Sequence, residues 1–116
     1  MAATATPGEA RFWALAEPLL GRPGVERSTM MGLPCLRILG AFFAAYDRST
    51  GDLLVKLPAS RVDELVDAGR AWSVVPAGRR FREWAAIPPE RSRTWKRLLG
   101  EALAFVEGNV HPGADA

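Results

Sequence analysis

Residues 30–46 read MMGLPCLRILGAFFAAY, and residues 51–58 read GDLLVKLP. Short apolar runs alternate here with turn-forming residues: Gly40 separates the first two runs, DRSTG at 47–51 separates the next two, and Pro58 closes the last. Apolar runs of this length, bounded by Gly, Asp and Pro, are typical of strands joined by tight turns and not of helices. We expect an antiparallel meander that forms the floor of one small domain.

Side chains alternate across a strand, so the sequence also predicts which residues share a face. In LLVKL at 53–57 the first, third and fifth side chains share one face, and Leu54 and Lys56 share the other. The run 41–46 is apolar at nearly every position, which indicates a strand covered on both sides.

Capping residues and apolar periodicity predict the remaining elements. Thr6 can cap a helix in which Pro7 takes the first position and Glu9 is placed for a capping box. Ser60 can cap a short middle helix, which Gly69 ends in a left-handed conformation. The expected elements are a helix over 7–20, an edge strand over 25–30, a short helix within 59–69, strands over 72–75 and 82–87 joined by a hairpin at 76–80, and a helix over 90–107.

Together these elements predict an α+β fold: an antiparallel meander sheet of about six strands with an N-terminal helix, a short middle helix and a C-terminal helix. The length of 116 residues fits one domain. We expect a flexible N-terminus over 1–8, a single α+β domain over 9–108 and a disordered tail over 109–116.

The composition indicates a reduced, soluble, cytoplasmic protein. Cys35 is the one cysteine of the sequence, so no internal disulfide can form. The start MAATATPG lacks the basic and apolar regions of a signal peptide, and no apolar run approaches the roughly 20 residues of a membrane span. We therefore expect no membrane partner.

The sequence offers little catalytic chemistry. One histidine, His111, and one cysteine cannot make a His/Cys metal cluster, and His111 lies in the expected tail. Neither glycine-rich phosphate-loop pattern is present. We therefore expect a non-enzymatic domain with no cofactor and no metal.

Positive charge gathers in the C-terminal third. Residues 79–97 contain seven basic and two acidic side chains, although the whole sequence has 15 basic and 13 acidic residues. Such a segment predicts an anionic partner, most simply DNA held through phosphate contacts with weak sequence specificity, and a plain solvated surface is the alternative. The candidate nucleic-acid-binding residues are Arg79, Arg80, Arg82, Arg93, Lys96 and Arg97.

Lys56 stands in an otherwise apolar strand, so it is a candidate for a ligand pocket, where it would serve an anion or a carbonyl group; Tyr46 is the second candidate. The other reading of Lys56 is a solvent-facing charge whose stem lies on apolar neighbours. Cys35 is either a small buried hydrophobe or a reactive thiol. A second function class follows: a protein-interaction or small-ligand-binding domain, with a homodimer through the edge strand 25–30 as one form.

The order helix, meander, helix, hairpin, helix resembles the N-terminal domain of TfoX and the related YjbR-like (MmcQ) proteins over about residues 10–108. The residues that carry the resemblance are Met30-Met31-Gly32, Phe42-Phe43-Ala44, the run Leu53 to Leu57, Ala68-Gly69, Arg82-Glu83-Trp84 before Pro88, and the helix over 95–104. It implies an α+β domain with an antiparallel sheet, in a family described as DNA-binding-like or as competence regulators.

Two departures limit what this resemblance implies. The family often has Met-Phe-Gly where Met31 stands before Gly32, and a longer TfoX has a second helical domain that these 116 residues do not include. The regulatory role is therefore not carried over.

Overall fold

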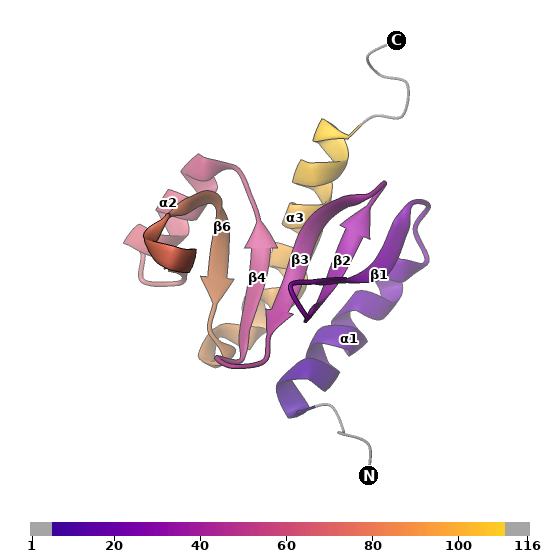
Figure 1. Cartoon of the computed structure of the whole chain (residues 1–116), viewed down its shortest axis with the longest axis horizontal. Helices are drawn as coiled ribbons and strands as arrows, with labels where there is room; N and C mark the ends of the chain where they lie inside the picture. The colour runs from indigo at the N-terminus through magenta and orange to yellow at the C-terminus, as the bar shows by residue number, and fades with distance from the viewer. Residues whose placement is uncertain (1–5, 111–116) are drawn as a thin grey trace.

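The computed structural model describes residues 6–110 and has an α+β fold built on a six-stranded antiparallel sheet (Figure 1). The strand order is β1-β2-β3-β4-β6-β5. The first four strands form the predicted meander, and β6 lies between β4 and β5. In chain order the elements are α1 (Pro7–Leu20), β1 (Val25–Met30), β2 (Leu33–Ile38), β3 (Ala41–Asp47), β4 (Asp52–Lys56), α2 (Ala59–Asp67), β5 (Trp72–Val74), the 3-10 turn η1 (Pro76–Gly78), β6 (Phe81–Ile87), the 3-10 turn η2 (Pro89–Thr94) and α3 (Trp95–Asn109).

The first two hairpins are closed by two-residue turns. Met31 and Gly32 have φ of 52° and 82°, and Leu39 and Gly40 have φ of 51° and 86°. Positive φ at both positions defines a type I′ turn, whose twist matches that of the flanking strands. The tight reversal expected at Gly40 is therefore confirmed.

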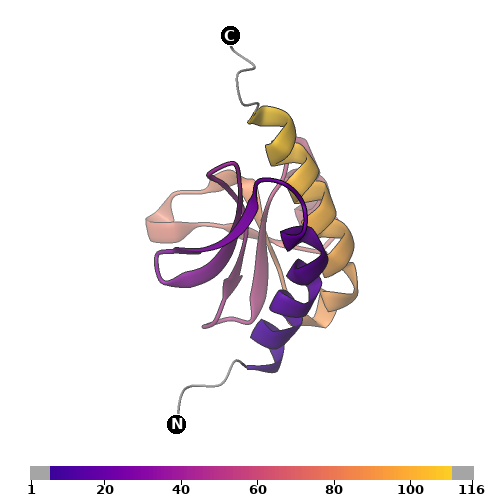
Figure 2. The same ribbon diagram turned by 90° about the vertical axis from the view of Figure 1, so that its right-hand side faces the viewer.

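The hydrophobic core lies between one face of the sheet and the helices. Figure 2 places α1 and α3 together on that face, and α2 contributes Val62 and Leu65 to the same core. The alternation predicted for β4 and its continuation is confirmed, because the first, third and fifth side chains of LLVKL are fully buried and Leu54 and Lys56 are not. The largest fully buried side chains include Trp95, Phe12, Phe43, Leu36, Ile38, Leu98 and Leu103.

The sheet has β1 and β5 at its two edges. The edge position predicted for residues 25–30 is confirmed. Glu26 and Arg27 are exposed on β1, and charged side chains of this kind discourage pairing with another strand.

The middle helix begins two residues earlier than a cap at Ser60 would place it. It starts at Ala59, and Pro58 occupies the capping position without any side-chain hydrogen bond, so the prediction that Ser60 caps the helix is wrong. The Pro58 carbonyl instead accepts from the N–H groups of Arg61 and Val62. Gly69 has φ of 73°, as its predicted role at the end of the helix requires.

The start of the last helix also differs from the prediction. Residues 89–94 form the 3-10 turn η2, with non-helical angles at Arg91, and the α-helix begins only at Trp95. Pro88 occupies the capping position of this turn and Pro89 its first position, where a missing N–H costs nothing; the departure from an α-helix is located at Arg91. Arg91 and Arg93 therefore lie before the α-helix and not within its first turn.

The structure bears only in part on the two predicted flexible ends. Residues 1–5 and 111–116, including His111, lie outside the described residues. Pro7 and Gly8 belong to α1, and Asn109 ends α3, so ordered structure extends slightly beyond 9–108. Among residues 6–110, no helix is long and apolar enough to cross a bilayer.

Candidate functional site

One face of the sheet has no helix packed on it. Figure 2 shows α1 and α3 on one side of the strands, while the turn between β1 and β2 and the turn η1 curve away on the other side. The expectation that the strand over 41–46 is covered on both sides is therefore confirmed only in part: residues 43–46 are buried in succession, but no helix among residues 6–110 covers the second face. Ala45 is nonetheless fully buried among its neighbours, whereas Phe42 is partly exposed on the uncovered face.

A groove of about 550 Å³ runs across this uncovered face. Its size falls within the roughly 300–1,000 Å³ of small-molecule sites, which are mostly lined by apolar and aromatic side chains. Leu54 lies at mid-strand in β4, and the β1–β2 turn and η1 contribute residues from either edge of the sheet. The apolar lining residues are Met30, Met31, Leu33, Ala41, Phe42, Leu54, Val74, Pro76, Phe81 and Trp84, and the charged ones are Asp47 and Lys56.

Large apolar side chains on this face are unusually exposed. Met31 is 96% exposed and Phe81 is 42% exposed. Trp72 and Val75, also exposed, line an adjoining hollow with Asp47 and Asp52. Contiguous exposed apolar surface of this kind is typical of interaction sites and ligand-binding grooves.

The two ends of the groove carry opposite charge. Lys56 ends β4, and Asp52 begins it, with Asp47 directly opposite Asp52 on β3. Residues 52, 54 and 56 share one face, so about 13 Å of strand separates the cation from the carboxylates. The groove is therefore apolar along its length and polar at its ends.

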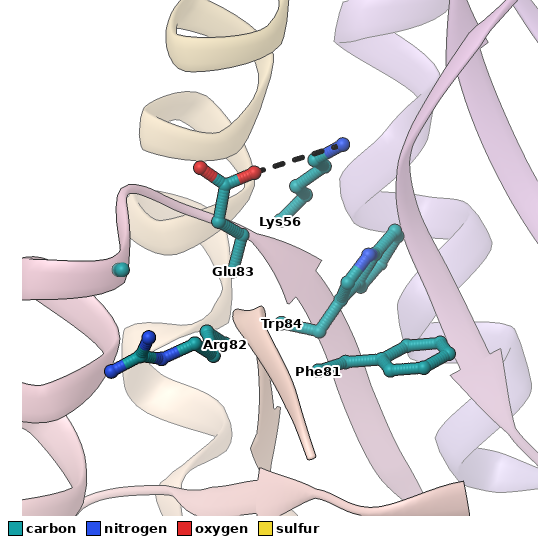
Figure 3. A pocket seen from close by; sticks show the side chains of 6 residues that line it. Lys56, Phe81, Arg82, Glu83 and Trp84 are labelled. Carbon is teal, nitrogen blue, oxygen red and sulfur yellow. Dashed lines mark ion pairs between the residues drawn. The ribbon is translucent and has the colours of Figure 1, made fainter. Parts of the chain in front are cut away.

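Lys56 is only loosely paired. Its Nζ lies 3.9 Å from Glu83 Oε1, and both side chains are partly exposed (Figure 3). Pairs of this kind contribute typically about 0–1 kcal/mol. Figure 3 shows the rings of Phe81 and Trp84 on the same side of β6 and Arg82 pointing away from Lys56. A hollow of about 460 Å³ lies beside the Lys56–Glu83 pair and is drawn in Figure 3. Lys56, Phe81 and Trp84 line both this hollow and the groove.

Tyr46, the second predicted pocket residue, lies on the opposite side of the sheet. Its side chain is buried in the core, its ring packs edge-on against Trp95 and tilted against Phe12, and its hydroxyl lies 3.5 Å from Thr6 Oγ1. Tyr46 and Lys56 therefore do not share a pocket.

The six predicted DNA-contacting residues fall into two groups. Arg79, Arg80 and Arg82 lie on and beside the connection from β5 to β6, and Arg93, Lys96 and Arg97 lie on η2 and α3. Carboxylates of α2 and α3 engage one arginine from each group: Arg80 Nη2 is 2.8 Å from Asp63 Oδ1, and Arg97 Nε is 3.8 Å from Glu101 Oε2. Arg61 connects the two helices, donating to Glu101 and to Glu64. Acidic side chains thus interrupt the basic surface between its two halves.

The other four candidates remain without a carboxylate. Arg79, Arg82, Arg93 and Lys96 have no acidic group within 4 Å among residues 6–110.

Cys35 is fully buried in β2, opposite Ser28 of β1. Burial raises the pKa of the Cys35 thiol, and this outweighs the opposing effect of a hydrogen bond with Ser28. A buried, protonated thiol is a weak nucleophile, so the geometry favours the packing role.

A partly buried ion pair between α1 and the turn after β3 was not predicted. The Glu9 carboxylate accepts from Arg48 Nε at 2.8 Å and Nη2 at 3.1 Å, and from Trp13 Nε1 at 3.4 Å. Thr6 Oγ1 caps the helix by accepting from the Glu9 N–H, as predicted. No local pattern in the sequence indicates the Arg48 contact, because 39 residues separate the two side chains.

The chain matches no protein-family model, no curated protein and no solved structure.

Proposed function

We propose that this domain binds a small, mainly apolar ligand in the groove on the uncovered face of its sheet. The observation that carries the proposal is the groove of about 550 Å³ itself, with Leu54 and Phe42 in its lining and Trp84 and Phe81 at its Lys56 end. Apolar side chains left beside such a hollow favour a ligand that removes them from water.

The groove also has the few polar groups that fix a ligand's orientation. Lys56 lies at one end and Asp47 at the other, and the lining between them is apolar. A small number of placed polar groups in an apolar lining is the usual composition of ligand sites.

The test is a titration with N-phenyl-1-naphthylamine, an uncharged dye whose fluorescence rises in apolar surroundings. We expect saturable binding by the wild-type chain and loss of at least tenfold in affinity in Leu54→Arg, which places charge and bulk in the groove. Ala104→Arg adds the same group at an exposed position of α3 and should bind normally.

Folding is checked by circular dichroism and thermal melting. Should Leu54→Arg unfold, Phe81→Arg replaces it, because Phe81 is already partly exposed and tolerates a polar group better. Dye binding that is equal in the groove variants and in Ala104→Arg would refute the proposal.

A second candidate function is DNA binding, favoured by the four basic side chains that lack a carboxylate partner. Because acidic side chains interrupt the basic surface, DNA phosphates would contact one half of this surface at a time. The expected dissociation constants are those of non-specific binding, on the order of 10⁻⁴–10⁻⁶ M. No base-reading element is part of this proposal, so sequence specificity would be weak.

Fluorescence anisotropy of labelled duplex DNA against salt tests this candidate. Arg79→Glu with Arg82→Glu, and separately Arg93→Glu with Lys96→Glu, should weaken binding and flatten the salt dependence. The control Arg22→Glu changes an arginine already paired with Glu107. A flat salt response of the wild-type chain would exclude DNA binding.

A further inference from the structure

We infer that the ligand of the groove is an organic acid: an apolar body with one carboxylate, which Lys56 binds. This inference rests on the proposed function and adds the chemical class of the ligand. The evidence is the difference between the two ends of the groove. One end has a cation with few bonding partners, and the other end has carboxylates.

The cationic end has unused binding capacity. The Lys56 ammonium has three donors, and its nearest carboxylate, Glu83, lies at the long distance of 3.9 Å. The Lys56 side chain is 36% exposed, and the rings of Trp84 and Phe81 flank the same hollow. A carboxylate placed beside the ammonium would gain a charge-assisted hydrogen bond at the border of an apolar surface.

At the acidic end, Asp47 is held by its own turn and lies beside a second carboxylate, Asp52. Asp47 Oδ1 accepts from the Ser49 N–H at 2.9 Å and from the Ser49 hydroxyl at 2.7 Å. Burial raises the pKa of Asp52, and the neighbouring Asp47 and Glu90 carboxylates add to this effect. A carboxylate placed at this end would therefore be repelled, which directs an anionic head group to Lys56.

The charges thus give the groove a direction. The carboxylate lies at Lys56, and the apolar body runs along Leu54 toward Phe42 and the β1–β2 turn. The roughly 13 Å of β4 from Lys56 to Asp52 matches an extended chain of about ten carbons. Decanoate, below its critical micelle concentration, is therefore the probe.

The experiment displaces N-phenyl-1-naphthylamine with three ten-carbon probes: decanoate, decan-1-ol and decyltrimethylammonium. We expect decanoate to bind about fivefold more tightly than the alcohol, the ratio that a partly exposed ion pair supplies, and the ammonium to bind most weakly. Lys56→Met keeps the apolar stem and should remove the preference for decanoate. Lys96→Met, which removes an exposed lysine of α3, should leave it unchanged.

Glu83→Gln provides an independent readout. It removes the competing carboxylate beside Lys56, so the preference for decanoate should rise, and added salt should reduce the preference in every chain that retains Lys56. A merely structural role for Lys56 would not produce these opposite effects.

The outcomes separate the two proposals. Equal binding of acid and alcohol, or preferred binding of the ammonium, overturns the organic-acid inference and leaves the groove as a ligand site. Failure of the dye and all three probes to bind overturns both. A homodimer that covers the groove is one specific cause of such a failure, and sedimentation velocity detects it. If the wild-type chain is a dimer and Leu54→Arg is a monomer, a second copy of the chain occupies the groove.

Discussion

Replacing Glu9 by Gln should destabilise the fold, and the cost can be estimated from its contacts. Glu9 is 8% exposed and accepts two hydrogen bonds from Arg48 and one from Trp13. Hydrogen bonds to charged groups contribute about 1.5–3 kcal/mol, and a partly exposed partner reduces this value because water and salt screen the pair. Arg48 is about half exposed, so we expect Glu9→Gln to lower the free energy of unfolding by about 1–2 kcal/mol at pH 7.

The effect should depend on pH in a defined direction. The hydrogen bond from Arg48 lowers the pKa of Glu9, and this effect outweighs burial, which raises it. Because the pKa is lower in the folded state, the ionised Glu9 carboxylate contributes its full stabilisation above the pKa of the unfolded chain, which is near 4.3. This stabilisation is lost as the pH falls through the lower pKa of the folded state. The difference between wild type and Glu9→Gln should therefore be constant near neutral pH and disappear in acid.

Urea unfolding followed by circular dichroism at several pH values measures both quantities. Glu17→Gln is the matched control on the same helix, because Glu17 and its partner Arg27 are both largely exposed and the change should be nearly neutral. The cost of Glu9→Gln should also shrink in an Arg48→Met background. A pH-independent cost, or the same cost in that background, would show that the pair does not act as described.

Three further predictions concern the core and the turns. Leu36→Ala should cost about 2–5 kcal/mol in the free energy of unfolding, because Leu36 is fully buried; a cost below 1 kcal/mol in urea unfolding would contradict its place in the core. Leu39→Asn should raise stability by about 0.5–1 kcal/mol, because Leu39 has a φ of 51° in a type I′ turn that favours Asn-Gly; a lower melting temperature would count against that turn geometry. Cys35 should react with a thiol reagent only as fast as the protein opens, so its labelling rate should rise steeply in urea; rapid labelling of the native protein would refute its burial.

The regular part of the fold could be predicted because it depends on local signals. Alternation in LLVKL placed Leu54 and Lys56 on one face of β4, and Gly40 marked a turn that requires positive φ. The start of α3 was predicted less well, because a 3-10 turn with non-helical angles at Arg91 precedes it, and the geometry of this turn depends on the neighbouring strand end.

The candidate site was predicted only in part. Lys56 was identified from its apolar neighbours in the sequence. The groove itself forms only because the β1–β2 turn and η1 both lie against one face of the sheet, and no local sequence pattern indicates this arrangement. Tyr46 was paired with Lys56 although the two side chains lie on opposite faces. Asp63, which contacts Arg80, lies 17 residues away along the chain, so the sequence pattern did not reveal this pair. Glu101 lies only four residues after Arg97, and it approaches that arginine along one face of the helix.

The order of strands in the sheet has a consequence for synthesis on the ribosome. The first four strands pair with sequence neighbours, so this hairpin series can assemble early, since closing short loops costs little entropy. The far edge of β4 becomes paired only when β6 has been synthesised. Much of the inner surface is covered only by α3, which emerges after the other elements described here. A nascent chain therefore presents a paired sheet with a bare inner surface until residues 95–109 emerge, and that interval is when chaperones would have most to shield.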